Sequence, residues 1–215
     1  MTKRALVLVC GLLVVVGCTR TIDAPKPQSQ VPVAPIAAGS VGDLLSEDAV
    51  KGDDGNLFTT VDPEECAGIA REVEAPFVFD HKPAAHTGGH WVTTGGTEVY
   101  IEEIVAVYRA NFDARSALAE ANRTIASCRG TPFTVTAMRG RTHVFSLLPQ
   151  QDSGDPNIVV WSFAAPTGWA CDNTFVAAHN AAVEITACAE TNGYDVLTLA
   201  KAALERIEKL ANTTL

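Results

Sequence analysis

Residues 168–189, GWACDNTFVAAHNAAVEITACA, form two runs of strand-forming residues on either side of His179-Asn180. A two-residue turn at these positions places Cys171 directly opposite Cys188, because both cysteines are equally distant from the turn. In this register the two residues form a non-hydrogen-bonded pair with Cα atoms ~4.5 Å apart, which is within disulfide reach. The stretch therefore predicts a β-hairpin closed by a disulfide.

Alternate residues of this hairpin divide between two faces. The face predicted to join the core carries Thr174, Val176, Val183 and Ile185. The other face carries Cys171, Cys188 and the candidate ligand-binding residues Trp169, Asn173, Phe175 and Glu184. Two aromatic rings, an amide and a carboxylate beside a disulfide are suited to a ligand surface, although such faces are more often partly covered packing. Trp91 is a further, weaker candidate.

The first residues indicate where the protein resides. Lys3 and Arg4 precede the apolar run 5–16, and Gly17 follows. A basic flank before a short apolar run is typical of a signal peptide, predicted here over residues 1–17. The sequence Val-Val-Gly-Cys at 15–18 resembles the bacterial lipobox, so Cys18 is the expected lipidation site and membrane anchor. An ordinary signal peptide with an incidental cysteine is the alternative.

Residues 18–40 are rich in proline and predict an extended tether before a domain at 41–215. The chain has 16 basic and 25 acidic residues and a net charge of -9. Removal of residues 1–17 takes away Lys3 and Arg4 and makes the net charge -11. Such an acidic protein has no basic field for a phosphate backbone, so nucleic acid is not an expected partner.

Four further cysteines remain after the signal peptide and Cys18 are set aside, and in an exported chain they predict two disulfides. If Cys171 pairs with Cys188, Cys66 pairs with Cys128 by elimination. Zinc binding is the alternative, but no CxxC spacing supports it.

Helix and strand patterns predict an α+β fold with one antiparallel sheet. Asp62-Pro63 and Asp113 are expected to begin two helices, and a third is expected over about 194–211. Strand patterns lie between the helices and are connected by short turns. They cover residues 91–94, 98–108, 133–138, 143–148 and 157–163 and the two arms of the hairpin.

His81, His86 and His90 lie within ten residues of one another, in a segment expected to be a loop. Three imidazoles can bind Zn or Cu, but the spacing matches no established motif, and a solvated loop is the plainer interpretation. Glu102 and Glu103 are adjacent in a strand and should point to opposite faces. No nucleophile motif or phosphate-binding loop is present, so we expect no catalytic residues and no cofactor.

The sequence Gly168-Trp169-Ala170-Cys171, the turn at His179-Asn180, the strand ending at Cys188 and the amphipathic helix after it resemble the PknH-like extracellular sensor domain. This family occurs on a mycobacterial receptor kinase and on many mycobacterial lipoproteins. The resemblance implies a twisted antiparallel sheet with packed helices, two disulfides and a solvent-filled cleft for an unidentified ligand. It implies no catalytic residues. Many members carry a second Asn or a basic residue at the turn, whereas this chain has His179-Asn180-Ala181.

Together these features predict a lipid-anchored sensory or ligand-binding module on the extracytoplasmic face of the cell membrane. It would bind a small or envelope-derived ligand without catalysis, and would carry that ligand or present it to a membrane protein. The alternative is a structural or protein-interaction lipoprotein. The first predicts a concave pocket with an aromatic lining, and the second predicts an exposed apolar patch.

Overall fold

The computed structural model describes residues 36–93, 96–191 and 193–213. All of them belong to one compact unit, Val33–Leu215. The predicted signal peptide, Cys18 and most of the predicted tether lie outside the described residues. Within the described ranges, none of the helices is both long and apolar enough to cross a membrane.

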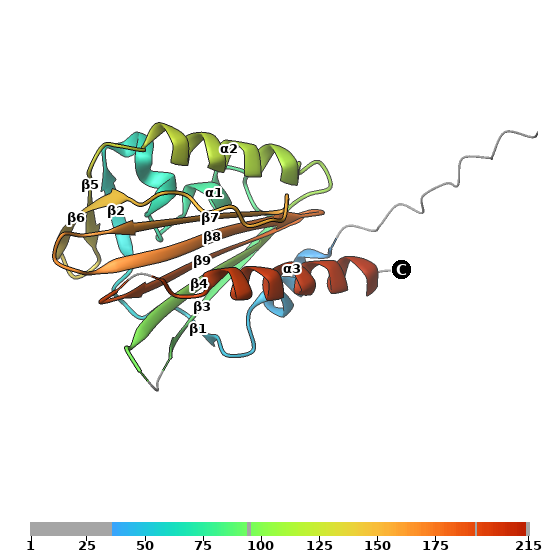
Figure 1. Cartoon of the computed structure of the whole chain (residues 1–215). Coiled ribbons are helices and arrows are strands. Elements are labelled where there is room, and N and C mark those ends of the chain that lie inside the picture. Colours follow the sequence, from blue (N-terminus) through green and yellow to red (C-terminus); the bar gives the residue numbers. More distant parts are fainter. Residues whose placement is uncertain (1–35, 94–95, 192, 214–215) are drawn as a thin grey trace, which may run out of the picture. The chain divides into compact units, whose positions relative to one another are not determined.

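Nine strands form one antiparallel sheet in the order β1-β3-β4-β9-β8-β7-β6-β5-β2 (Figure 1). This arrangement confirms the predicted α+β class and the single antiparallel sheet. The strands are β1 (Val50–Lys51), β2 (Phe58–Asp62), β3 (Ala85–Thr93), β4 (Val99–Val107), β5 (Phe133–Ala137), β6 (Thr142–Leu147), β7 (Ile158–Ala164), β8 (Ala170–Ala178) and β9 (Ala181–Ala189).

The hairpin β8–β9 has the predicted register. Ala178 pairs with Ala181 across the turn, and Cys171 pairs with Cys188 at a Cα–Cα distance of 4.1 Å. These two cysteines form a disulfide, and so do Cys66 and Cys128. Both predicted pairings are confirmed, so the described cysteines are not available to bind zinc.

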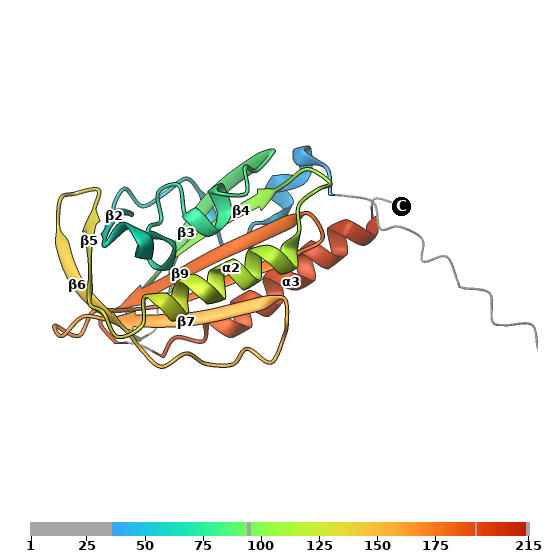
Figure 2. The ribbon, with the colours of Figure 1, turned by 90° about the horizontal axis from the view of Figure 1, so that it is seen from above.

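Helices pack on both faces of the sheet. The helix α2 (Ala114–Ser127) runs along β7 and β8, together with the 3-10 helix η2 (Glu64–Ile69) and the short α1 (Pro76–Phe79) (Figure 2). The helix α3 (Val196–Thr213) packs on β7, β8 and β9 from the other side, beside the 3-10 helix η1 (Ala38–Leu44). We call these the α2 face, which carries Phe175, and the α3 face, which carries Val176.

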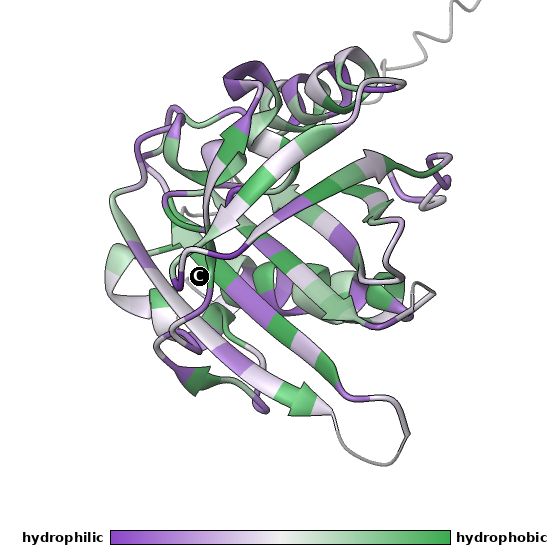
Figure 3. Ribbon diagram, turned by 90° about the vertical axis from the view of Figure 1, so that its left-hand side faces the viewer, coloured by the Kyte–Doolittle hydropathy of each residue, from purple (hydrophilic) through white to green (hydrophobic). Residues whose placement is uncertain are grey.

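Both faces of the central hairpin are covered, which explains why β8 and β9 are buried along their full length. Thr174, Val176, Val183 and Ile185 lie in the core as predicted. Their neighbours on the α2 face are buried as well, because η2, α1 and α2 cover them. Other strands mix hydrophobic and hydrophilic residues along their length (Figure 3).

Of the two helix starts predicted at Asp62-Pro63 and Asp113, the structure confirms one and contradicts the other. Asp113 accepts a hydrogen bond from the backbone N–H of Ser116 at 3.1 Å, so it caps α2 as predicted. Asp62 does not cap a helix, because it is the last residue of β2 and is followed by a cis peptide bond to Pro63. The helix after it is a 3-10 helix without a side-chain cap.

The segment expected to be a loop at residues 85–90 belongs to β3 instead. The reason lies at Gly89, where an added Cβ would approach the Cβ of Ala49 to 2.9 Å and the carbonyl oxygen of Val50 to 3.1 Å. Glycine therefore allows β1 to pair closely with β3. A Gly-Gly pair in a sequence usually indicates a break in a strand. Here Gly89 instead permits the close approach of the edge strand β1.

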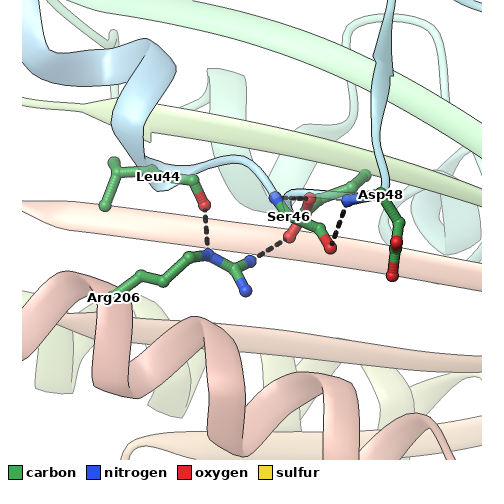
Figure 4. Close-up of polar contacts among 5 residues, drawn as sticks. Leu44, Ser46, Asp48 and Arg206 are labelled. Atoms are coloured by element: carbon green, nitrogen blue, oxygen red, sulfur yellow. Dashed lines mark hydrogen bonds and ion pairs between the residues drawn. The ribbon is translucent and has the colours of Figure 1, made fainter.

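The described residues 36–40, which fall within the predicted tether, contact the rest of the domain. Ile36 is buried, and its backbone N–H and carbonyl both bond to the side chain of Asn180 at 2.7 and 3.0 Å. A second contact holds the end of η1, where the guanidinium of Arg206 donates to the carbonyl of Leu44 at 2.7 Å and pairs with Glu103 (Figure 4). The domain therefore includes the segment around Ile36.

Candidate functional site

A cavity of about 800 Å³ lies on the α2 face at one end of the sheet. At this end β6 pairs with β7 only through Ser146 and Leu147. Strands β2, β5 and β6 rise on the α2 side of the sheet (Figures 1 and 2). On this side one wall of the cavity is lined by Phe58 of β2, His143 of β6, and Arg139 and Arg141 between β5 and β6. The opposite wall of the cavity is lined by Tyr100 and Glu102 of β4, Cys188 of β9, and Trp169, which directly precedes β8. The residues that line the cavity include Glu72, Tyr100, Glu102, Arg139, Arg141, His143, Trp169 and Cys188.

A smaller cavity of about 190 Å³ adjoins the first. Both are lined by Leu57, Glu72 and Glu102. The smaller one also reaches Glu184 and Thr186 on β9, so it lies deeper over the central strands. We call it the inner cavity and the larger one the outer cavity.

Burial raises the pKa of two glutamates shared by the cavities. The pKa of Glu72 rises to about 8, although its Oε2 accepts a hydrogen bond from the Phe58 N–H at 2.6 Å. The pKa of Glu102 also rises to about 8, through burial and then through the negative charge of Glu72. Neutral pH therefore leaves much of this carboxyl pair protonated, and a nearby positive charge would ionise it.

Glu184 is the most deeply placed of the cavity carboxyls. Its side chain projects from the central strand β9, and the residue is 6% exposed. Its Oε2 has no hydrogen-bond partner within the described part of the chain. Burial, followed by the charge of Glu72, raises its pKa well above the ordinary value of 4.5.

The wall of the outer cavity near β8 is aromatic. The rings of Tyr100 and Trp169 lie 6.1 Å apart between centroids, next to Cys188 of the second disulfide. Across from them, Arg139, Arg141 and His143 project from the β5–β6 hairpin. The outer cavity therefore combines an aromatic wall with basic groups. Its acidic lining includes Glu98 and Glu190 as well as Glu72 and Glu102, the two carboxyls that it shares with the inner cavity.

The structure separates the five ligand-binding candidates. Trp169 lines the outer cavity and Glu184 the inner one. Phe175 is fully buried against Phe77 of α1, with ring centroids 5.8 Å apart. Asn173 is buried and donates to the carbonyl of Cys171, and Trp91 packs on the α3 face. Neither cavity is lined by Phe175, Asn173 or Trp91, so the structure does not bring these three residues to the candidate site.

The three histidines are held apart. His81 lies within 3.5 Å of Glu120 on α2 and packs against Phe112. His86 and His90 both lie on β3, four residues apart, which separates their Cα atoms by ~13 Å in a strand. Among the described residues no set of three His, Cys, Asp or Glu side chains is placed to hold a metal ion. The geometry thus offers no support for the metal hypothesis.

Glu72 and Glu102 were not singled out as ligand candidates from the sequence. The strand pattern correctly indicates that Glu102 and Glu103 point to opposite faces, since Glu103 pairs with Arg206 of α3. The strand pattern does not indicate whether Glu102 or Glu103 points into a cavity. Glu72 follows η2 in an irregular segment and carries no sequence signal of its site.

Comparisons with known proteins agree with this architecture. Residues 27–206 match the PknH-like extracellular domain. The chain belongs to this family. The PknH-like fold is also found in the crystal structure of the extracellular domain of PknH from Mycobacterium tuberculosis, with a TM-score of 0.62 and 18% sequence identity over 82% of this chain and 97% of that one. No curated protein matches the chain. This PknH-like domain is therefore an extracellular sensor domain.

Proposed function

We propose that this PknH-like domain is a non-catalytic ligand-binding sensor, anchored through lipid on Cys18 to the extracytoplasmic face of the cell membrane. Its ligand is a small molecule or a fragment of the cell envelope. The observation that carries the proposal is the outer cavity, whose aromatic wall and inner carboxyls lie on the α2 face beside the disulfide-linked hairpin β8–β9.

The size and lining of the outer cavity support ligand binding. Its volume of about 800 Å³ lies within the range of small-molecule sites. Trp169 and Tyr100 offer flat surfaces on which a sugar ring or an apolar group can stack. The basic groups of Arg139, Arg141 and His143 and the carboxyls shared with the inner cavity provide polar contacts that can orient a ligand.

The lining chemistry also favours binding over catalysis. Among the described residues, neither cavity is lined by a serine, and the only lining cysteine, Cys188, is held in a disulfide. A nucleophile with an adjacent base, the usual requirement for acyl transfer, is not assembled there. A sensor of this kind acts by carrying its ligand or by presenting it to a membrane protein partner.

Native mass spectrometry of the protein purified from its own envelope tests this function. We expect a retained small molecule in the wild type, and a protein mass that includes acyl chains on Cys18. The variant W169A should lose the retained molecule, because Trp169 lines the outer cavity. W91A is the matched control, since Trp91 packs on the opposite face of the sheet.

Loss of the molecule from W91A as well, or its retention by W169A, would contradict binding in the outer cavity. A wild-type protein without any bound molecule would favour the structural-lipoprotein alternative. An unmodified mass at Cys18 would contradict the proposed anchor.

A further inference from the structure

Carboxyl groups gather at the inner cavity without a basic partner. They come from four separate segments of the chain and are Asp53, Glu72, Glu102 and Glu184. The described residues that line this cavity include no lysine, arginine or histidine. Glu103 also borders it, but its carboxylate is paired with Arg206. Ionised carboxyls here therefore repel one another without a compensating positive charge.

Glu184 provides a second and independent indication of a ligand. Its residue is buried, and its Oε2 lacks a hydrogen-bond partner within the described ranges. Buried polar atoms in folded proteins are nearly always hydrogen-bonded, and an exception calls for a specific cause. Because Glu184 lines the inner cavity, a donor entering that cavity would supply the missing partner.

We propose that the inner cavity binds the primary ammonium group of an organic ligand, with Glu184 and Glu102 as its counter-charges. The inference rests on the proposed function, since it places this ammonium group at the inner end of the same ligand site. The remainder of the ligand would extend into the outer cavity, past Glu72 toward Trp169 and Tyr100.

An ammonium group fits these residues better than a metal ion. A divalent metal needs several oxygen ligands that converge within about 2.6 Å, and the described residues contain no such set. An ammonium group donates up to three hydrogen bonds of about 2.8 Å in different directions. The inner cavity, at about 190 Å³, is large enough for such a group and part of its alkyl chain.

Proton release should accompany this binding. The raised pKa values of Glu72 and Glu102, about 8 in each case, mean that these carboxyls hold protons at neutral pH. A bound cation favours the ionised forms, so the affinity should increase as the pH rises toward 9. Other titratable groups around these carboxyls are Asp53, Asp54, His90 opposite Glu102 on β3, Tyr108 near Glu184, and Arg139, Arg141 and His143 across the outer cavity.

Calorimetric titration of the full-length protein with cadaverine tests the proposal, and 1,5-pentanediol is the uncharged probe of the same length. The amines of cadaverine resemble the lysine side chain and stay charged throughout the pH range used. We expect cadaverine to bind and the diol not to bind. The affinity for cadaverine should increase about tenfold or more between about pH 6.5 and about pH 8.5, because a carboxyl of pKa near 8 ionises in that interval.

Substitution of the carboxyls locates the site. E184Q should weaken cadaverine binding about tenfold or more, the usual scale for loss of a partly buried ion pair. E205Q removes one negative charge from the exposed side of α3 and should leave binding unchanged. If E184Q does not fold, as judged by circular dichroism, E102Q supplies the same comparison, because Glu102 lines both cavities.

A second probe, Nα-acetyl-lysine methylamide, carries the amine on a peptide-like molecule. Comparing its affinity with that of cadaverine distinguishes a peptide ligand from a free polyamine. Tighter binding of this probe indicates an envelope peptide, and tighter binding of cadaverine indicates a free polyamine. Either result supports an ammonium site. Its Nε-acetylated form is uncharged and should not bind.

Several results would overturn the inference. These are equal binding of the diol, an affinity independent of pH, and cadaverine binding unaffected by E184Q and E102Q. Tight binding of a divalent metal that E184Q abolishes, without amine binding, would assign the site to a metal instead. If no amine binds but W169A still loses a co-purifying molecule, the ammonium site fails while the sensor function stands.

Discussion

Glu102 and Glu103 show how one residue step in a strand changes the role of a carboxyl group. The side chain of Glu102 lies in the cavities of the α2 face, whereas that of Glu103 is buried on the α3 face. There Glu103 pairs with Arg206 and accepts a hydrogen bond from the N–H of Ser46 at 2.6 Å (Figure 4). A buried carboxylate with a partner stabilises the chain segment that it contacts, while an unpartnered one is suited to a ligand.

Replacing Arg206 tests this difference. R206A leaves the Glu103 carboxylate buried without its cation and removes the hydrogen bond to Leu44, so the free energy of unfolding should fall by about 3–5 kcal/mol. The double variant R206M/E103L should recover part of this loss, because it removes both charges but leaves the Leu44 carbonyl and the Ser46 N–H without these partners. Urea denaturation measures both values. A loss below about 1 kcal/mol for R206A would mean that the pair behaves as a surface salt bridge.

The β8–β9 turn has a second task at the scale of elements. Asn180, at the turn, accepts a hydrogen bond from the N–H of Ile36 and donates to the carbonyls of Ile36 and Tyr108. The turn thus joins the beginning of the domain to the end of β4.

N180A should therefore loosen the start of the domain. Three backbone groups lose their partner, and we expect a loss of stability of about 2–4 kcal/mol. Limited proteolysis followed by mass spectrometry should show faster cleavage between residues 36 and 45. The control H179N changes the neighbouring, more exposed turn residue, whose positive φ asparagine tolerates. Equal cleavage of N180A and wild type would show that this contact does not hold the segment.

At the scale of the whole molecule, the cavity carboxyls link folding to pH. Glu72 and Glu102 have pKa values of about 8 in the folded protein, against an ordinary value of 4.5. Between these two values the folded protein holds protons that the unfolded chain has released. Folding is therefore favoured at the acidic end of this interval, and the advantage disappears as the pH rises through about 8.

The free energy of unfolding should accordingly fall by about 2–3 kcal/mol between about pH 5 and about pH 9, because solvent screens the charges of these two partly exposed side chains. Thermal unfolding followed by circular dichroism should show a melting temperature lower by about 4–10 °C at the higher pH. E72Q/E102Q should flatten this dependence, whereas E205Q should preserve it. A wild-type stability that does not fall over the same interval would show that the carboxyls are already ionised when folded.

The sequence by itself determined the register of the β8–β9 hairpin and the position of α2, because both depend on interactions between residues that are close in the chain. The two-residue turn at His179-Asn180 sets the register of the hairpin, and that register alone brings Cys171 to Cys188. In the same way, Asp113 and the apolar stripe after it specify α2, because capping and helical spacing involve residues within a few positions of each other.

Only the tertiary structure decided where the cavities lie and which residues line them. Glu72, Glu102 and Glu184 come from distant parts of the chain, and they meet because β4 pairs with β9 while η2 and β2 close over the same face. Likewise, Phe175 and Trp169 share a face of the hairpin, yet α1 covers only Phe175. Burial and the pKa shifts that follow from it depend on long-range packing, which the spacing of residues in a sequence does not reveal.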